Sequence, residues 1–278
     1  MRRPLFLHVV LYCFMLSTPN HRDQRPIWRI DLHALGYESI EEARVNFCGP
    51  FIVVNPDPAS SLIFDTTSKQ RMAGDRASKM PLASCQDFAH RQPVSPISDR
   101  HIVAHWKNMV IEQVCDVESC TQPPGKPRVR NVTYYLERPG KPKLTLFHLN
   151  CLPRIPQFVG DSYILVFLCD LKGIVFNTQG ERIYEMAALS FPYIAVNSAG
   201  TRFAVYERDE SFWHELEGTT NRVRVEVYQS STGKKLLELR WRVNGESTRD
   251  GRVGLSDEGS LLAIIRSGEV LVFAIPFS

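Results

Sequence analysis

The histidines of this chain have the spacing that comes nearest to a metal site. His101 and His105 stand four positions apart in the segment HIVAH, with His90 upstream, and we expect the first two to share one face of a strand. A zinc site needs three or four converging ligands. Because no spacing identifies His90 as a third ligand, we interpret these residues as exposed strand histidines and expect no metal and no cofactor.

Three aspartates, Asp161, Asp170 and Asp209, lie near the ends of predicted strands. An acid in this position can serve a catalytic centre, but it more commonly caps a turn by accepting hydrogen bonds from backbone amides. The chain has no G-x-S-x-G sequence and no S-x-x-K sequence accompanied by its partner motifs, so no serine nucleophile is indicated. The sequence therefore assigns no catalytic residue.

The segment 211–217 (SFWHELE) places two aromatic rings, a histidine and two acids in a long insertion between strands. Long loops on rigid scaffolds often carry binding sites, so Phe212, Trp213 and His214 are the candidate binding residues. The alternative is that Phe212 and Trp213 pack over the edge of a sheet. Trp106 is a similar but more isolated aromatic residue.

Seven cysteines are present, and none has the C-x-x-C spacing of a metal site. Cys115 and Cys120 bound the segment CDVESC, which could close a small disulfide loop in an oxidising compartment; the alternative is two free thiols. Cys48 and Cys169 lie among apolar strand residues, where we expect them to act as small buried hydrophobic side chains.

The N-terminus has the pattern of an export signal. Arg2 and Arg3 precede the apolar run LFLHVVLYCFML, and small or helix-breaking residues follow it. We predict a signal peptide over 1–18, a linker over 19–26 and one domain over 27–278, hence export to the periplasm or the outside of the cell. If the apolar run instead forms a strand, the protein is cytoplasmic.

Composition limits the partners of this domain. A net charge of +3, from 33 basic and 30 acidic residues, is too small to indicate nucleic acid or an anionic membrane as the partner. After residue 18 no stretch approaches the roughly 20 apolar residues that span a bilayer, so we expect no stable membrane insertion. We expect a monomer whose ligand is a protein or a small molecule.

A short sequence pattern that occurs twice near the C-terminus indicates how the domain is built. Residues 194–205 (IAVNSAGTRFAV) run from an apolar strand through a turn closed by Gly200 into a second strand, and 253–264 (VGLSDEGSLLAI) repeat this pattern at Gly259, 59 positions later. A strand–turn–strand repeat at this spacing favours a β-propeller. Hairpin patterns over 61–70, 173–182 and 225–234 support the same architecture.

Several strands can be placed from their pattern. Residues 47–55 predict one strand, and 163–168 predict a strand buried on both faces. In 223–229 the valines alternate with Arg224, Glu226 and Tyr228, so we expect a half-buried strand with one polar, outward face.

The spacing of these elements predicts an all-β fold, a single propeller of five blades with four antiparallel strands each. The C-terminal strand 269–275 lacks room for a complete last blade, and 27–32 could supply the missing strand. Pairing of the two chain ends would close the ring and remove exposed sheet edges.

The turns NSAGTRFAVY (197–206) and SDEGSLLAII (256–265) resemble the S-P-D-G-x-x-(L/F)-A turn of WD-repeat-like propellers. The opening 27–37 (IWRIDLHALGY), followed by FIVV and LIFDTTSKQ, also resembles exported propeller-like proteins of soil bacteria. The Gly-His and Trp-Asp pairs of true WD repeats are missing. Repeated hairpins without a catalytic constellation predict a non-catalytic binding or scaffold module; the alternative is a propeller-type hydrolase or lyase with its site at the mouth of the central channel.

Overall fold

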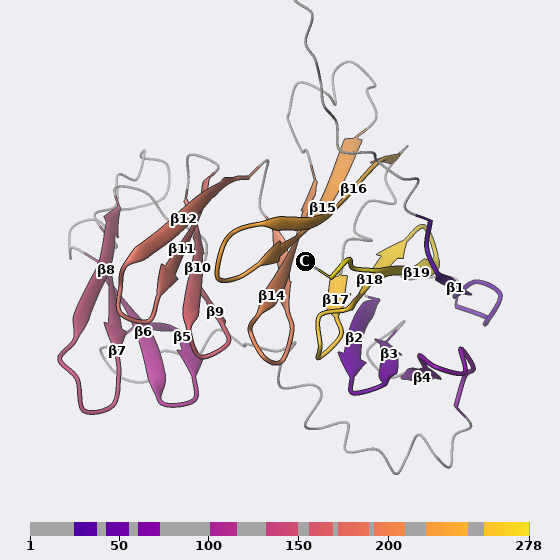
Figure 1. The fold of residues 1–278 in the computed structure, drawn as a ribbon, viewed down its shortest axis with the longest axis horizontal. Helices are drawn as coiled ribbons and strands as arrows, with labels where there is room; N and C mark the ends of the chain where they lie inside the picture. The colour runs from indigo at the N-terminus through magenta and orange to yellow at the C-terminus, as the bar shows by residue number, and fades with distance from the viewer. Residues whose placement is uncertain are drawn as a thin grey trace, which may run out of the picture.

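The computed structural model of the chain describes residues 25–37, 43–55, 61–72, 101–115, 132–149, 156–168, 172–188, 192–208, 221–243 and 253–277 (Figure 1). Within these ranges the chain forms nineteen β-strands and no helix. None of the described segments is therefore a long apolar helix of the kind that crosses a membrane.

The strands form five antiparallel sheets, which we number I to V in chain order. Sheet I contains β2 (Arg44–Cys48), β3 (Phe51–Asn55) and β4 (Leu62–Asp65). Sheet II contains β5 (His101–Trp106), β6 (Met109–Cys115), β7 (Val132–Glu137) and β8 (Leu144–Leu149). Sheet III contains β9 (Gln157–Val159), β10 (Tyr163–Phe167), β11 (Lys172–Asn177) and β12 (Arg182–Ala187). Sheet IV contains β13 (Tyr193–Val196), β14 (Arg202–Arg208), β15 (Asn221–Gln229) and β16 (Lys235–Val243). Sheet V contains β17 (Val253–Leu255), β18 (Leu261–Arg266), β19 (Glu269–Ala274) and, from the other end of the chain, β1 (Trp28–Asp31).

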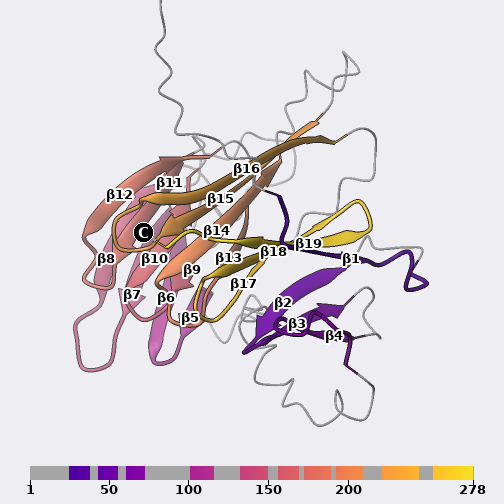
Figure 2. The ribbon, with the colours of Figure 1, turned by 45° about the vertical axis from the view of Figure 1, so that its right-hand side comes forward.

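The N-terminal strand completes the last sheet. β1 pairs antiparallel with β19, with Trp28 opposite Val272 and Asp31 opposite Glu269. The backbone nitrogen of Ile27 extends this ladder by donating to the carbonyl of Val272 at 2.8 Å. Figure 2 shows β1 beside β19 at the outer edge of the sheet. The predicted pairing of the two ends of the domain is confirmed.

Apolar side chains from both faces of the central strands hold successive sheets together. Four buried clusters lie between sheets II and III, III and IV, IV and V, and V and I. Each uses large, fully buried residues, which contribute about 1.5–3 kcal/mol apiece. Examples from the four clusters are Phe158, Phe203, Leu262 and Ile52. None of the four clusters joins sheet I to sheet II.

This arrangement is a β-propeller: meander sheets packed face to face in the order II, III, IV, V and I, with sheet V shared by the two chain ends. The predicted number of five sheets is confirmed, and four of them have four strands. Sheet I has three named strands among the described residues. Beyond β4 the chain turns back, and the backbone nitrogen of Met72 donates to the carbonyl of Ile63 at 2.8 Å.

The prediction of one strand over 47–55 is wrong. This segment is the hairpin of β2 and β3, in which Cys48 pairs with Phe51 across a turn at Gly49 and Pro50. A Gly-Pro dipeptide is a strong turn signal, and the continuous apolar character of its flanks concealed it.

The repeated phrase of the sequence does form equivalent turns. Gly200 lies between β13 and β14 with φ of 67°, and Gly259 lies between β17 and β18 with φ of 71°. Gly200 also lies against Gly160 in a turn of the preceding sheet. The approach is so close that a Cβ atom added at position 200 would stand 2.4 Å from the Cα atom of Gly160. Only glycine combines this backbone conformation with so close an approach.

Candidate functional site: charged groups between the sheets

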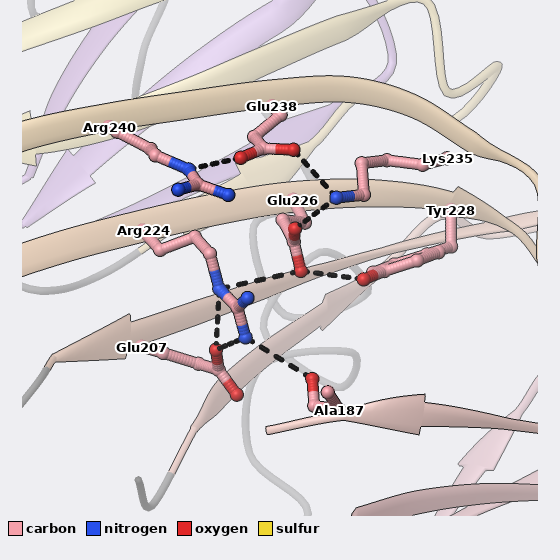
Figure 3. A network of polar contacts seen from close by, with 8 residues as sticks. All are labelled: Ala187, Glu207, Arg224, Glu226, Tyr228, Lys235, Glu238 and Arg240. Carbon is pink, nitrogen blue, oxygen red and sulfur yellow. Dashed lines mark hydrogen bonds and ion pairs between the residues drawn. The ribbon is translucent and has the colours of Figure 1, made fainter. Parts of the chain in front are cut away.

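A network of charged side chains occupies the face of sheet IV that is directed toward sheet III (Figure 3). Its members come from three neighbouring strands and are brought together by cross-strand pairing, since Glu207 is opposite Arg224 and Glu226 is opposite Glu238. The complete set is Glu207 on β14, Arg224, Glu226 and Tyr228 on β15, and Lys235, Glu238 and Arg240 on β16.

The Glu207–Arg224 pair is the most deeply buried ion pair of this network. The side chain of Glu207 is 1% exposed and that of Arg224 is 14% exposed. The Nε atom of Arg224 donates to Oε2 of Glu207 at 2.9 Å, and Nη2 contacts the same oxygen. Nη2 also donates to the backbone carbonyl of Ala187 on β12, at 3.2 Å. Arg224 therefore neutralises a buried acid and ties sheet IV to sheet III.

Glu226 is the second buried acid, with a side chain 2% exposed. The Tyr228 hydroxyl donates to its Oε2 atom at 2.6 Å, and the Nζ atom of Lys235 stands 2.5 Å from its Oε1 atom. Arg224 Nε lies 3.5 Å from the same carboxylate. A buried carboxylate is tolerated only with such compensation, because desolvating a charge costs several kcal/mol.

Lys235 and Glu238 continue the network toward solvent. Lys235 Nζ donates to Oε2 of Glu238 at 2.6 Å, and the Nε atom of Arg240 contacts Oε1. Burial lowers the pKa of Lys235, but the hydrogen bonds that its ammonium donates to Glu226 and Glu238 outweigh burial, and the net shift of the pKa is upward. Burial similarly opposes ionisation of Glu238, and its bonds to Lys235 and Arg240 bring its pKa below the usual value.

Tyr228 is the neutral member of the network. Burial, followed by its hydrogen bond to Glu226, raises the pKa of the phenol far above its usual value. Its ring is stacked on Phe203 at 5.4 Å between centroids, within the cluster joining sheets III and IV. The hydroxyl is thus held protonated against a carboxylate inside the protein, and the arrangement fixes the position of β15.

Sheet II contains a smaller network of the same kind, in which a buried acid is paired with a basic side chain. Glu112 on β6 has a side chain 6% exposed and is paired with Lys143. The Nζ atom of Lys143 also stands 3.6 Å from Glu137 and lies 4.6 Å above the Tyr135 ring. The buried acids Glu112, Glu207 and Glu226 thus all have basic partners on neighbouring strands or, for Lys143, directly before one.

Asp161 links two sheets rather than standing free. Its carboxylate accepts hydrogen bonds from Trp106 Nε1 and Lys107 Nζ, both at 2.6 Å. These two contacts, Lys107 first, hold the pKa of this largely exposed acid below its usual value. Trp106 and Lys107 lie at the β5–β6 turn and Asp161 at the β9–β10 turn, so the contact joins sheets II and III. We expected Asp161 to cap its own turn, but its carboxylate instead connects that turn to the turn of the neighbouring sheet.

Turns at the same end of the other sheets are joined in a similar way. Asp257 accepts from the backbone nitrogen of Gly49 at 3.0 Å, which joins sheets V and I. Asn197 Nδ2 donates to the carbonyl of Asp257 at 3.0 Å, which joins sheets IV and V. Together with the contact of Gly160 and Gly200 between sheets III and IV, these links form a continuous row of turns. The first hairpin of each sheet is therefore fixed to its neighbour.

The prediction that His101 and His105 share one face of a strand is wrong. A bulge in β5 between Ile102 and Ala104 shifts the register, so His101 pairs with Gln113 while His105 pairs with Val110. Positions 113 and 110 of β6 lie on opposite faces of the sheet, because side chains alternate along a strand. Positions 101 and 105 therefore do not share a face. His90 lies outside the described residues, and within the described residues no cluster of three metal-ligating side chains occurs.

Several other predicted residues lie outside the described part of the chain. They are Phe212, Trp213, His214, Asp170, Asp209, Cys120, Cys169 and the predicted signal peptide 1–18, and the side chain of Cys115 belongs with them. The predicted linker 19–26 lies outside it as well, apart from residues 25 and 26. Strands β14 and β15, which end at Arg208 and begin at Asn221, flank the predicted binding loop.

Cys48 corrects the cysteine analysis. It is disulfide-bonded and only partly buried at the end of β2, so it is not the small buried hydrophobic residue that its apolar neighbours predicted. Its position beside the turn at Gly49 explains the difference, because the last residue of a hairpin strand reaches the edge of the core. The side chains of all other cysteines lie outside the described residues.

The predicted half-buried strand over 223–229 is also wrong in one respect. Glu226 and Tyr228 are 2% and 7% exposed, so the expected outward face of β15 is covered by sheet III along half of its length. The charged alternation at 224, 226, 238 and 240 was visible in the sequence as a polar face. No residue of this polar face indicated that sheet III covers it, since Arg224 is opposite Arg240 and Glu226 is opposite Glu238.

The comparisons with known proteins are limited to structure. No protein-family model matches the chain, and no curated protein matches it. A chain in the crystal structure of a mitotic checkpoint complex has 10% identity and a TM-score of 0.42, over 92% of this chain and 96% of that one. The C-terminal WD40 domain of Sif2 has 11% identity and a TM-score of 0.33, over 84% and 69%. The computationally designed Ika4 protein has 15% identity and a TM-score of 0.37, over 62% and 88%.

The propeller fold is established by the five sheets, their order and the β1–β19 pairing. The chain is WD-repeat-like in its fold, as the turns at Gly200 and Gly259 indicated. The resemblance to exported proteins of soil bacteria remains a prediction.

Proposed function

We propose that this propeller is a non-catalytic scaffold that binds another protein. The observation that carries the proposal is the way its acids are used. Glu112, Glu207, Glu226 and Asp161 all bond to basic or aromatic side chains of neighbouring strands or turns. Such groups hold sheets in place, whereas a hydrolase or lyase needs acids with room for substrate beside them.

The rigidity of the fold supports the same proposal. Linked turns at one end and buried charge networks between sheets fix the positions of surface residues before a partner arrives. A preorganised surface loses less conformational entropy on binding and therefore binds more tightly.

We further propose that the protein works in an oxidising compartment outside the cytoplasm. The disulfide of Cys48 supports this, because disulfides persist mainly in exported proteins. Sequencing the N-terminus of the protein purified from its producing cells tests it. A mature chain that begins near residue 19 is expected, and an intact Met1 would contradict export.

Affinity capture tests the scaffold function. The full chain is immobilised and exposed to the secreted and envelope fractions of its producing cells, with heat-unfolded chain as the matched control. We expect one or a few proteins to be retained by the folded chain in near-equal molar amounts. Recovery of the same proteins on the unfolded chain, or of none, contradicts the proposal.

A further inference from the structure

The outermost strand of sheet IV has the longest open edge among the described strands. β16 pairs with β15 on one side and ends the sheet, and within the described ranges no strand pairs with its other side (Figure 1). It has nine residues, whereas the outermost strands of the other sheets have four to six. An open edge presents a row of unpaired backbone N–H and C=O groups, so it is a template for one further strand.

The middle of β16 is the regular part of this edge. A bulge interrupts the ladder near the start of the strand, because Val227 pairs with Leu237 while Tyr228 pairs with Lys235. From Leu237 to Trp241 the register with β15 is unbroken. The residues 237–241 therefore offer an uninterrupted edge to a second strand.

Contacts within the protein hold both ends of this edge. A lysine commonly protects an open edge by pointing outward. Lys235 does not, because its Nζ atom stands 2.5 Å from Oε1 of Glu226 and 2.6 Å from Oε2 of Glu238. At the other end, the guanidinium carbon of Arg266 lies 5.3 Å from the centroid of the Trp241 ring. An edge fixed in this way loses little conformational entropy when another strand pairs with it.

Symmetry restricts how this edge pairs with a copy of itself. Two identical antiparallel strands in one sheet are related by a two-fold axis perpendicular to the sheet, and this axis maps each face of the sheet onto the same face. Side chains alternate between the faces, so a residue lies opposite its own copy or opposite a residue an even number of positions away. Opposite charges two positions apart can therefore pair across the axis, whereas charges three positions apart cannot.

The charges of β16 have the spacing that this symmetry requires. Glu238 and Arg240 are two positions apart on the same face, and with the axis at Leu239 each lies opposite the other residue type of the second copy (Figure 3). The same register sets Leu237 opposite Trp241, so apolar side chains meet on the other face. The neighbouring symmetric registers set Glu238 or Arg240 opposite its own copy, and like charges directly opposite are destabilising.

The other outermost strands do not combine length with this spacing. On β12 the opposite charges, Arg182 and Glu185, are three positions apart. On β1 Arg29 and Asp31 have the required spacing, but the strand has four residues and Arg29 is paired with Glu269. β4 has one acid and no base, and β8 has no acid. Charge complementarity thus favours β16 as the edge that takes a second copy.

We propose that β16 pairs with β16 of a second copy of this chain, antiparallel and about a two-fold axis at Leu239. The two sheets IV then form one continuous sheet, with two pairs of Glu238 and Arg240 beside the axis, and the protein is a dimer in place of the monomer expected from its sequence. Such a contact is smaller than a standard stable interface, so we expect a weak dimer with a Kd of roughly 10–100 µM. The dimer is independent of the scaffold function.

Sedimentation velocity of the full chain from about 1 to 300 µM tests the proposal. We expect the sedimentation coefficient to rise from that of a monomer to that of a dimer, and the Kd to increase with salt, which screens the ion pairs. Arg240 is 67% exposed, so Arg240→Glu should fold. This variant places only acids beside the axis and should raise the Kd at least about tenfold. Arg182→Glu is the matched control, because it makes the same charge change on the outermost strand β12 and should leave the Kd unchanged.

Mixing two charge variants distinguishes this register from any other contact. Arg240→Glu leaves only acids at positions 238 and 240, and Glu238→Arg leaves only bases. Neither variant should pair with itself, whereas an equimolar mixture should form a heterodimer. The double variant E238R/R240E restores both pairs and should dimerise again. Urea unfolding curves that match that of the parent identify the variants with an intact fold; if Glu238→Arg does not fold, the comparison of Arg240→Glu with Arg182→Glu decides.

A parent chain that sediments as a monomer at every concentration overturns the proposal. Equal weakening of the dimer by Arg240→Glu and Arg182→Glu also overturns it, because the copies then meet through another surface. If the parent is monomeric and affinity capture recovers a partner that Arg240→Glu no longer binds, the edge takes a foreign strand and the second copy is wrong. The scaffold function survives that result and is rejected only by affinity capture itself.

Discussion

Replacing Arg224 with alanine is the sharpest test of how the sheets are held together. Glu207 would keep its charge in a site where its side chain is 1% exposed and its nearest cation is gone. Breaking a buried ion pair from one side costs about 3–5 kcal/mol. The lost bond to the carbonyl of Ala187 adds about 1 kcal/mol. Because Arg224 is 14% exposed and water can enter in its place, we expect a total of about 3–4 kcal/mol.

The double variant distinguishes a lost pair from simple loss of packing. Replacing Glu207 and Arg224 together with leucine removes both charges and leaves no buried charge of this pair uncompensated, although the bond to the Ala187 carbonyl is still lost, so stability should return to within about 1–2 kcal/mol of the parent. Arg240→Ala is the matched control on the same face. Its side chain is 67% exposed, and the loss of its contact with Glu238 should cost less than about 1 kcal/mol.

Equilibrium urea unfolding followed by tryptophan fluorescence measures these free energies, provided that the slope with denaturant is the same for all variants. A loss of unfolding free energy below about 1 kcal/mol for Arg224→Ala would refute the claim that the Glu207–Arg224 pair stabilises the fold. Additive effects in the double variant would refute it as well, because residues in direct contact should show a coupling energy.

Three further predictions concern the turns and the buried titrating groups. Gly200→Ala should destabilise the protein by about 2 kcal/mol or more, because the φ of 67° and the contact with Gly160 both exclude a Cβ atom. Gly36 has a φ of 90° and open space around it, so Gly36→Ala should show only the smaller backbone cost. Equal urea midpoints for the two variants would argue against the linked turns. Burial raises the pKa of three tyrosines in the described part of the chain, so the folded state favours their neutral form. This contribution to stability is fully present below the usual pKa of about 10 and is lost as the pH rises toward the folded-state values. Absorbance at alkaline pH should therefore show these three phenols ionising only as the protein unfolds, and their titration in the folded state would contradict the structure. They are Tyr134, Tyr184 and Tyr228. The pKa of Glu238 is lowered in the folded state, so its contribution to stability is present above about pH 4.3 and is lost as the pH falls through the folded-state pKa. The free energy of unfolding of Glu238→Gln should therefore depend less on pH between about pH 5 and pH 3 than that of the parent. Parallel pH dependences for the two proteins would exclude the pairing with Lys235.

Local patterns in the sequence were sufficient for the overall architecture. The sequence pattern repeated at Gly200 and Gly259 requires a tight turn between two apolar strands, and such a turn leaves few alternatives to a hairpin. The incomplete last sheet likewise required another strand, and the alternating segment at 27–32 was the remaining candidate. These inferences depend on short-range geometry, which the sequence records directly.

The candidate site could not be predicted in the same way. Whether Glu226 faces water or another sheet depends on what packs against β15, and no residue near Glu226 records that. The bulge that separates positions 101 and 105 in β5 also depends on its partner strand. The Arg266–Trp241 contact joins two sheets through residues that are 25 positions apart, so neither residue alone indicates it.

Photo-crosslinking from position 193 tests the central claim most directly. A benzophenone amino acid replaces Tyr193 in the full chain, with the same substitution at Ile183, an exposed apolar residue on β12, as the control. We predict that position 193, where the native tyrosine is 55% exposed, forms an adduct with one partner protein and that position 183 forms none. Adducts that are equal at both positions, or the absence of any adduct at position 193, would contradict a propeller that binds a partner protein through the exposed side of β13.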